Sequence, residues 1–182
     1  MRARSLLCLG LLTAAVVSPL QGQGATLVRD LNTGSAELLS LQFPEIFSVG
    51  TKAFFTLGTE LWVTDGTEAG TLPLAAGTDI LFQESLRNLL IYGSAVGDNQ
   101  PEQLWRSDGT RAGTYPLTAA SSLGLVPFSV KSFAGGVAFE LLQGGSCELW
   151  TSGGTVATTR RVAALARQAE GLAAGSHTFY FS

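Results

Sequence analysis

The stretch ELWVTDGTEAGT at residues 60–71 decides the fold of this chain, because close copies of it recur along the sequence. The second copy is QLWRSDGTRAGT at residues 103–114, and the third is the shorter ELWTSGGT at residues 148–155. All three tryptophans of the chain occupy the same place in these copies: Trp62, Trp105 and Trp150. Their spacing of about 44 residues is typical of a repeat architecture.

Each copy of the motif sits in a unit with a common plan. Apolar runs precede the motif, at residues 53–55, 89–92 and 137–139. Strand-like stretches follow it, at residues 71–74, 114–117 and 159–162. Another weaker strand opens each unit, around residues 46–49 in the first and 127–130 in the third. A unit therefore holds about four short strands in about 44 residues, which is the pattern of a β-propeller blade.

The Trp-bearing strand has no face that suits water. Side chains alternate along a strand, so Leu61 and Val63 share one face while Trp62 lies on the other. A sheet with one wet face would show cleaner alternation of apolar and polar residues. We therefore expect stacked blades, with the three tryptophans structurally equivalent and mostly buried. A tryptophan that stacks on a sugar or a base is the alternative, but its recurrence in all three units favours packing.

The predicted fold is all-β, a β-propeller-like array of about 3.6 four-stranded repeats across residues 25–182. Residues 27–31 resemble the strand after the motif, and residues 178–181 resemble the strand before it. We expect an incomplete propeller or a fragment of a longer repeat protein. No helix longer than two turns is predicted, although residues 163–174 have high helix propensity.

The Asp-Gly pair of the motif predicts a tight turn. Asp65 can accept hydrogen bonds from backbone N–H groups, and Gly66 can adopt a positive φ. The alternative is calcium, with Asp65 and Asp108 as ligands. One carboxylate per loop is few for an ion that takes six to eight oxygens. Gly153 also stands where the third aspartate would be, so turn stabilisation is favoured.

Residues 1–24 have the pattern of a secretory signal peptide. Arg2 and Arg4 precede an apolar run at residues 6–17, and small residues precede a possible cleavage site before Ala25. The apolar run is too short to span a bilayer, and no later stretch is long enough. We therefore expect a secreted or cell-surface protein with no membrane span. Cys147 then remains as a single cysteine, which excludes a disulfide framework and a thiolate metal site. It is expected to be a small core or surface residue rather than a nucleophile.

Charge and composition exclude several functions. The chain has a net charge of −3 and no basic run longer than two residues, so no nucleic-acid partner is expected. His177 is the only histidine, and no motif supports a catalytic triad around it. A propeller-type glycosidase, or part of one, stays the enzyme alternative, by fold analogy alone. We assign no catalytic, cofactor-binding or metal-ligating residues and expect no cofactor.

The repeated motif resembles that of the ELWxxDGT repeat family of bacterial secreted and surface proteins. Residues 60–71 fit it fully, the second copy departs at Gln103, and the third lacks the aspartate and the Ala-Gly-Thr end. The resemblance implies an extracellular propeller-like protein without established catalytic residues. We therefore expect a secreted, non-catalytic repeat module for binding, adhesion or surface structure, with an unidentified protein or glycan ligand. The polar insertion at residues 95–101 is the best candidate for a ligand-facing loop, and the alternative, a tolerated insertion without a role, is favoured over it.

Overall fold

The computed structural model describes residues 46–76, 78–96, 102–119, 126–143, 146–166, 172–175 and 179–181. Within these residues the chain is all-β, and its one helical element is a 3₁₀ turn at Val156–Thr158. No helix in this part of the chain has the length and apolar character needed to cross a membrane. The predicted signal peptide, residues 27–31 and His177 lie outside the described residues.

Three four-stranded antiparallel sheets follow one another along the chain, each a meander in sequence order. The first comprises β1 (Ile46–Val49), β2 (Lys52–Leu57), β3 (Glu60–Thr64) and β4 (Leu72–Ala75). The second comprises β5 (Thr78–Leu86), β6 (Leu89–Val96), β7 (Gln103–Ser107) and β8 (Tyr115–Pro116). The third comprises β9 (Val126–Phe133), β10 (Gly136–Gln143), β11 (Ser146–Ser152) and β12 (Arg160–Leu165). The hairpin of β13 (Leu172–Ala174) and β14 (Phe179–Phe181) follows them.

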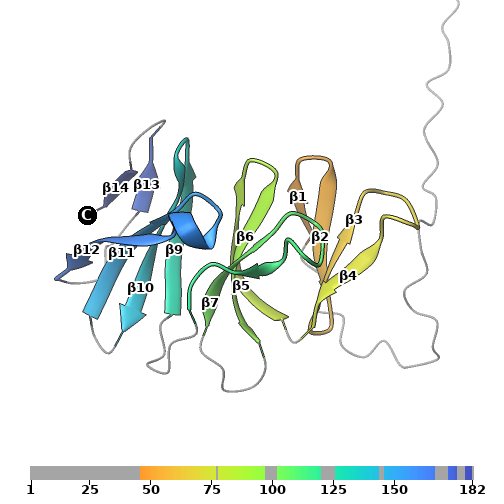
Figure 1. Cartoon of the computed structure of the whole chain (residues 1–182), viewed down its shortest axis with the longest axis horizontal. Helices are drawn as coiled ribbons and strands as arrows, with labels where there is room; N and C mark the ends of the chain where they lie inside the picture. Colours follow the sequence, from red (N-terminus) through yellow and green to blue (C-terminus); the bar gives the residue numbers. More distant parts are fainter. Residues whose placement is uncertain are drawn as a thin grey trace, which may run out of the picture.

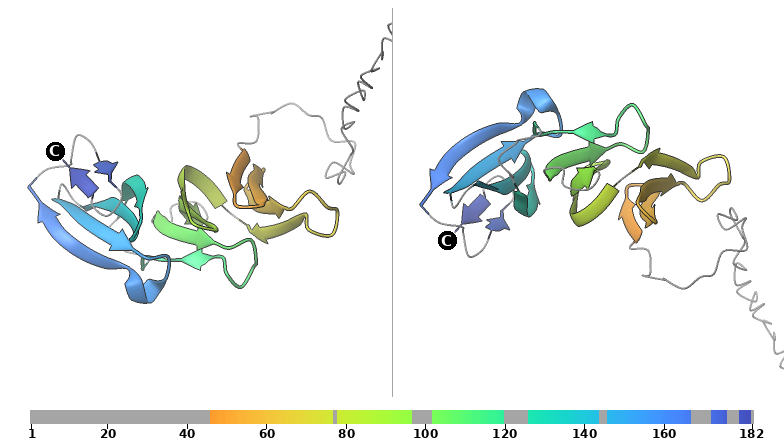
Figure 2. Two further views of the ribbon diagram at one scale, coloured as in Figure 1. Left: turned by 90° about the horizontal axis from the view of Figure 1, so that it is seen from above. Right: turned by 90° about the horizontal axis from the view of Figure 1, so that it is seen from below.

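The three sheets form a row in which each sheet packs face to face against the next (Figure 1). Seen from above or below, they follow a shallow arc, with the opening strands along one edge (Figure 2). The expected four-stranded units are thus confirmed, and the described sheets do not close into a ring. Strand β5 is the opening strand that the common plan predicts for the second unit, although the sequence analysis gives no position for it. In the stretch of high helix propensity, β12 extends to Leu165 and β13 begins at Leu172. Residues 167–171 between them are not described.

The hydrophobic core consists of clusters between neighbouring sheets. Seven buried side chains fill the space between the first two sheets: Val49, Phe54, Leu61, Val63, Leu74, Leu90 and Tyr92. Eight fill the space between the second and third sheets: Leu86, Ile91, Leu104, Leu117, Val130, Val137, Phe139 and Leu141. The prediction that neither face of the Trp strand is left in water is confirmed in the first sheet, where Leu61, Trp62 and Val63 are all buried.

A stacked aromatic pair repeats in every sheet. Each tryptophan stacks on the ring directly opposite it on the preceding strand. The ring centroids are 6.3 Å apart for Phe55–Trp62, 6.3 Å for Tyr92–Trp105 and 6.4 Å for Phe139–Trp150. The predicted equivalence of the three tryptophans is therefore confirmed. Their burial differs, because Trp62 is buried whereas Trp105 and Trp150 are half-buried.

The motif glutamate holds the tryptophan in place. Residues two apart on a strand share a face, so Trp62 Nε1 donates to Glu60 Oε2 at 3.2 Å, and Trp150 Nε1 donates to Glu148 Oε2 at 3.0 Å. Gln103 replaces the glutamate in the second sheet and donates instead to the Thr118 carbonyl, at 2.7 Å. Trp105 Nε1 is buried there without a hydrogen-bond partner. The replacement of glutamate by Gln103 in the second copy thus removes the tryptophan–glutamate hydrogen bond that the first and third copies keep.

Replacing Trp62 by alanine tests the packing role. We expect Trp62→Ala to lower the free energy of unfolding by about 3–5 kcal/mol, because truncation of a large buried ring leaves a cavity. Leu57→Ala, on the same strand pair but 42% exposed, is the matched control and should cost well under half as much. Urea denaturation of the three proteins measures both effects. Equal midpoints for wild type and Trp62→Ala would contradict the packing role.

Candidate functional site

The three motif loops are the most regular feature outside the sheets. They connect β3 to β4, β7 to β8 and β11 to β12, and cover residues 64–71, 107–114 and 152–159. In an antiparallel meander these loops lie at the same end of the sheets as the turn between the first two strands (Figure 1). They also hold the two aspartates, Asp65 and Asp108, for which the sequence left open a turn or a calcium ligand.

The first loop is a closed set of hydrogen bonds around Asp65. Its Oδ1 accepts the Thr67 backbone N–H at 2.9 Å and the Thr67 hydroxyl at 2.7 Å. The Thr67 hydroxyl accepts the Gly70 N–H at 3.0 Å, and the Thr71 hydroxyl donates to the Thr67 carbonyl at 2.7 Å. The hydroxyls of Thr64 and Thr71, 2.8 Å apart, join the two ends of the loop. Asp65 therefore works as a turn acceptor.

The second loop repeats this arrangement and adds a cation. Asp108 Oδ1 accepts the N–H and the hydroxyl of Thr110 at 2.9 and 2.7 Å. Arg106 Nη2 lies 3.0 Å from the other carboxylate oxygen, Asp108 Oδ2. The Arg106 Nε also donates to the Gly113 carbonyl, at 3.2 Å. The Arg106 guanidinium thus joins Asp108 near the start of the loop to Gly113 near its end.

The third loop keeps the same fold with different atoms. Gly153 stands in place of the aspartate, and Thr158 stands in place of the glycine that is Gly70 in the first loop. The Thr158 hydroxyl accepts the N–H groups of Gly153 and Thr155, at 3.1 and 3.2 Å. Ser152 and Thr159 close the loop through their hydroxyls at 2.7 Å. The third copy therefore extends to Thr159, beyond the end that its sequence suggested.

Space explains why these two changes occur together. A Cβ atom on Gly70 would collide with the Asp65 carboxylate, and one on Gly113 would collide with that of Asp108. An aspartate at the second loop position therefore requires a glycine at the seventh. In the third loop the small residue is at the second position and the larger one at the seventh. Gly153 leaves the space that the Thr158 side chain occupies. Aligning the third copy without a gap is the sequence signal that could have found this exchange.

The motif glycines also receive side chains from the neighbouring sheet. Lys52 Nζ donates to the Asp108 carbonyl at 2.8 Å, and its side chain would be 2.7 Å from a Cβ on Gly109. Leu89, the equivalent residue of the second sheet, would be 2.7 Å from a Cβ on Gly154. These glycines have φ of +84° and +90°, so the position serves both the turn and the contact between sheets.

Cations reinforce the same junctions. Arg106 Nη1 reaches the third sheet and donates to the Gly154 carbonyl at 3.0 Å. In the opposite direction, Arg111 Nε donates to the Pro73 carbonyl of the first sheet at 3.0 Å. The sequence pattern missed Lys52 and Arg106, because nothing in the neighbouring residues marks them as contacts between sheets.

Hydrogen bonding sets the acidity of the two aspartates. The Thr67 hydroxyl and backbone N–H lower the pKa of Asp65 below its ordinary value of 3.8. Burial raises the pKa of Asp108, but hydrogen bonds from Thr110 and the charge of Arg106 outweigh it, so that this pKa is also lowered. Both groups therefore accept their hydrogen bonds as carboxylates at neutral pH.

The other sequence candidates are placed as follows. The described residues hold no group of three or more His, Cys, Asp and Glu side chains that could bind a metal ion. Cys147 is 2% exposed and is therefore a core residue, one of the two structural alternatives expected for it. Of the insertion at residues 95–101, Ala95 and Val96 end strand β6, and residues 97–101 are not described.

Exchanging the third loop for the first tests the steric rule. Gly153→Asp alone and Thr158→Gly alone should each lower the free energy of unfolding by about 1–3 kcal/mol, the first through a clash and the second through lost hydrogen bonds. The double variant recreates the first loop and should lie within about 1 kcal/mol of wild type. Urea denaturation of the four proteins measures the coupling. Additive losses in the double variant would contradict the rule.

Acid titration tests the two carboxylates. Because their pKa values are lowered by folding, their stabilisation is complete above the ordinary carboxyl range and is lost as the pH falls through the lowered values. The melting temperature of wild type should therefore fall more steeply below about pH 4 than that of Asp65→Asn/Asp108→Asn. Asparagine keeps an acceptor oxygen for the threonine bonds but has no charge. Parallel curves for the two proteins would show that the carboxylates do not titrate in this way.

Comparison of the sequence with known protein families and with curated proteins gives no match. The three motif loops are tied internally by hydrogen bonds, and side chains of neighbouring sheets join the second loop to the first sheet and the third loop to the second. Together they make a stiff end to the stacked sheets.

Proposed function

We propose that this chain is a secreted, non-catalytic repeat module of the ELWxxDGT type that presents its surface to an extracellular ligand, a protein or a glycan. The observation that supports this most is the row of motif loops, in which hydrogen bonds and side-chain contacts join the second loop to the first sheet and the third loop to the second sheet. In the three described loops the repeated Asp, Gly and Thr positions, with Gly153 and Thr158 exchanged in the third, make turn hydrogen bonds. Rigid elements that display variable surface are the usual basis of binding modules.

The arrangement of the sheets supports a propeller-like array. Successive four-stranded meanders pack face to face, with the aromatic pair of the second and third sheets turned toward the sheet before. Strands β13 and β14 repeat the first two strands of a unit beside the third sheet. Such stacking gives each inner sheet two dry faces and leaves the strand edges and loops for contact with a ligand.

Secretion rests on residues 1–24, with Arg2, Arg4 and the apolar run at residues 6–17. An extracellular location is also compatible with the single cysteine of the remaining chain, since Cys147 is buried. Expression of the chain with and without residues 1–24 in a bacterial host tests this part of the proposal. The protein should reach the culture medium or the cell surface only when these residues are present.

Binding and catalysis are separated by two measurements on the same protein. The full secreted chain is applied to an array of immobilised glycans and to bacterial and animal cell surfaces, and is then incubated with the same glycans in solution. Binding without release of reducing ends supports the module. Turnover of any glycan would favour the alternative, a propeller-type glycosidase. Deletion of residues 96–100 in parallel shows whether the polar insertion takes part, since unchanged binding would remove it from consideration.

A further inference from the structure

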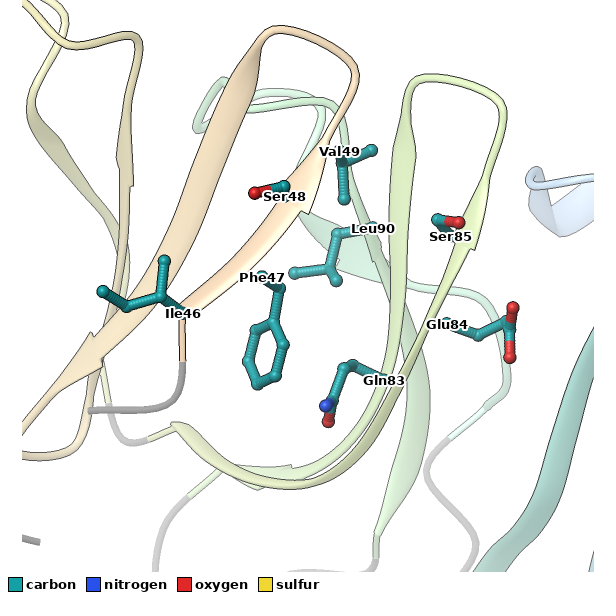
Figure 3. A pocket seen from close by; sticks show the side chains of 8 residues that line it. All are labelled: Ile46, Phe47, Ser48, Val49, Gln83, Glu84, Ser85 and Leu90. Carbon is teal, nitrogen blue, oxygen red and sulfur yellow. The ribbon is translucent and has the colours of Figure 1, made fainter. Parts of the chain in front are cut away.

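A groove separates the first two sheets at the edge where their opening strands lie. It has a volume of about 350 Å³ and runs between β1 and β5. This volume lies within the usual range of small-molecule sites, about 300–1,000 Å³. Phe47 and Gln83 point into the space between the two strands, whereas Glu84 projects from the far side of β5 (Figure 3).

The repeat explains why the groove is open at this place. The pairing registers make Ser48, Ser85 and Ser132 equivalent residues of the three opening strands. Between the second and third sheets, the Ser132 hydroxyl donates to Glu84 Oε1 at 2.9 Å and bridges β9 to β5. Between the first two sheets, the position equivalent to Glu84 is Phe47, which has no acceptor. The bridge is therefore absent there, and Ser85 remains exposed.

The lining of the groove combines an apolar floor with neutral polar groups. Val49 and Leu90 are buried at its base, and the half-buried Phe47 adds an aromatic ring. The exposed side chains of Gln83 and Ser85 supply a carboxamide and a hydroxyl. The one charged residue of the lining is Glu84, and its carboxylate is bound to Ser132 instead. The groove thus offers hydrogen bonds and an apolar surface without a free charge.

From this chemistry we infer that the groove between β1 and β5 binds a neutral sugar residue of a glycan. A pyranose ring has an apolar C–H face that fits against an aromatic ring, and hydroxyls that pair with a carboxamide and a serine. The absence of a cation in the described lining disfavours phosphorylated or strongly acidic ligands. The inference rests on the proposed binding function and specifies where one glycan class is held.

Two variants of the full chain test the groove. Gln83→Ala removes the carboxamide. Phe47→Glu places a carboxylate at the position equivalent to Glu84, where it would accept a hydrogen bond from Ser85, as Glu84 does from Ser132, and narrow the groove. Each should weaken binding of the neutral hexose oligosaccharides retained on the array at least tenfold in calorimetric titration. Glu68→Ala changes an exposed side chain that does not line the groove. It is the matched control and should bind as wild type does. Circular dichroism and urea midpoints establish that Gln83→Ala keeps the fold, whatever the effect of Phe47→Glu.

The outcomes separate the site from the function. Retained neutral oligosaccharides that are lost by Gln83→Ala support the groove. Undiminished binding by Gln83→Ala would overturn the groove while leaving the binding function in place. If wild type retained only a protein partner, or an extended peptide competed at the groove without any glycan binding, the sugar assignment would be wrong. No binding to any glycan or cell surface would overturn both the site and the proposed function.

Discussion

The stacking of a tryptophan on the ring across from it is the contact on which the rest of this structure depends. The pair lies at the centre of each sheet, where the second and third strands meet, and it makes one face of the sheet too apolar for water. Such pairs add roughly 0.5–1.5 kcal/mol beyond the burial of their area. Since the opposite face of the same strand carries buried aliphatic residues such as Leu61 and Leu149, a sheet of this kind needs a neighbour on both sides. Stacking of units follows from that requirement.

The motif loops set the spacing between neighbouring sheets in the same way at each repeat. Their glycines reverse the chain and at the same time accept a side chain of the preceding sheet, Lys52 at Gly109 and Leu89 at Gly154. A larger residue there would strain the turn and also push the sheets apart. In the third loop, Gly153 and Thr158 replace the Asp and Gly of the other two loops, and hydrogen bonds still close the turn. The turn therefore depends on a suitable acceptor rather than on one residue type. A carboxylate and a hydroxyl can each hold the turn, provided that the opposite position leaves room.

Departures from the repeat are where the units acquire individual properties. Gln103 in place of glutamate leaves the Trp105 N–H without its acceptor, and Phe47 in place of an acidic residue leaves the first pair of sheets without the bridge seen between the next pair. The first departure lies at the Trp105 Nε1 atom, which solvent does not reach. The second opens a groove at an edge that solvent reaches. In a repeat protein, a change at one equivalent position can thus open a groove without disturbing the common core.

The amino-acid sequence by itself determined the all-β class, the period of the units, their four-stranded plan and the equivalence of Trp62, Trp105 and Trp150, because these follow from local alternation and from self-similarity. It also indicated the turn role of Asp65, which involves residues only two positions apart. The position of strand β5 was not located, since TDILFQESL has no clear alternation and gains its pairing from β6. The partners of Lys52 and Arg106, the compensation by Thr158 and the groove at Phe47 were decided by the tertiary structure. Each depends on which atoms of different sheets, or of opposite ends of one loop, come within a few ångströms, and no local pattern specifies those distances.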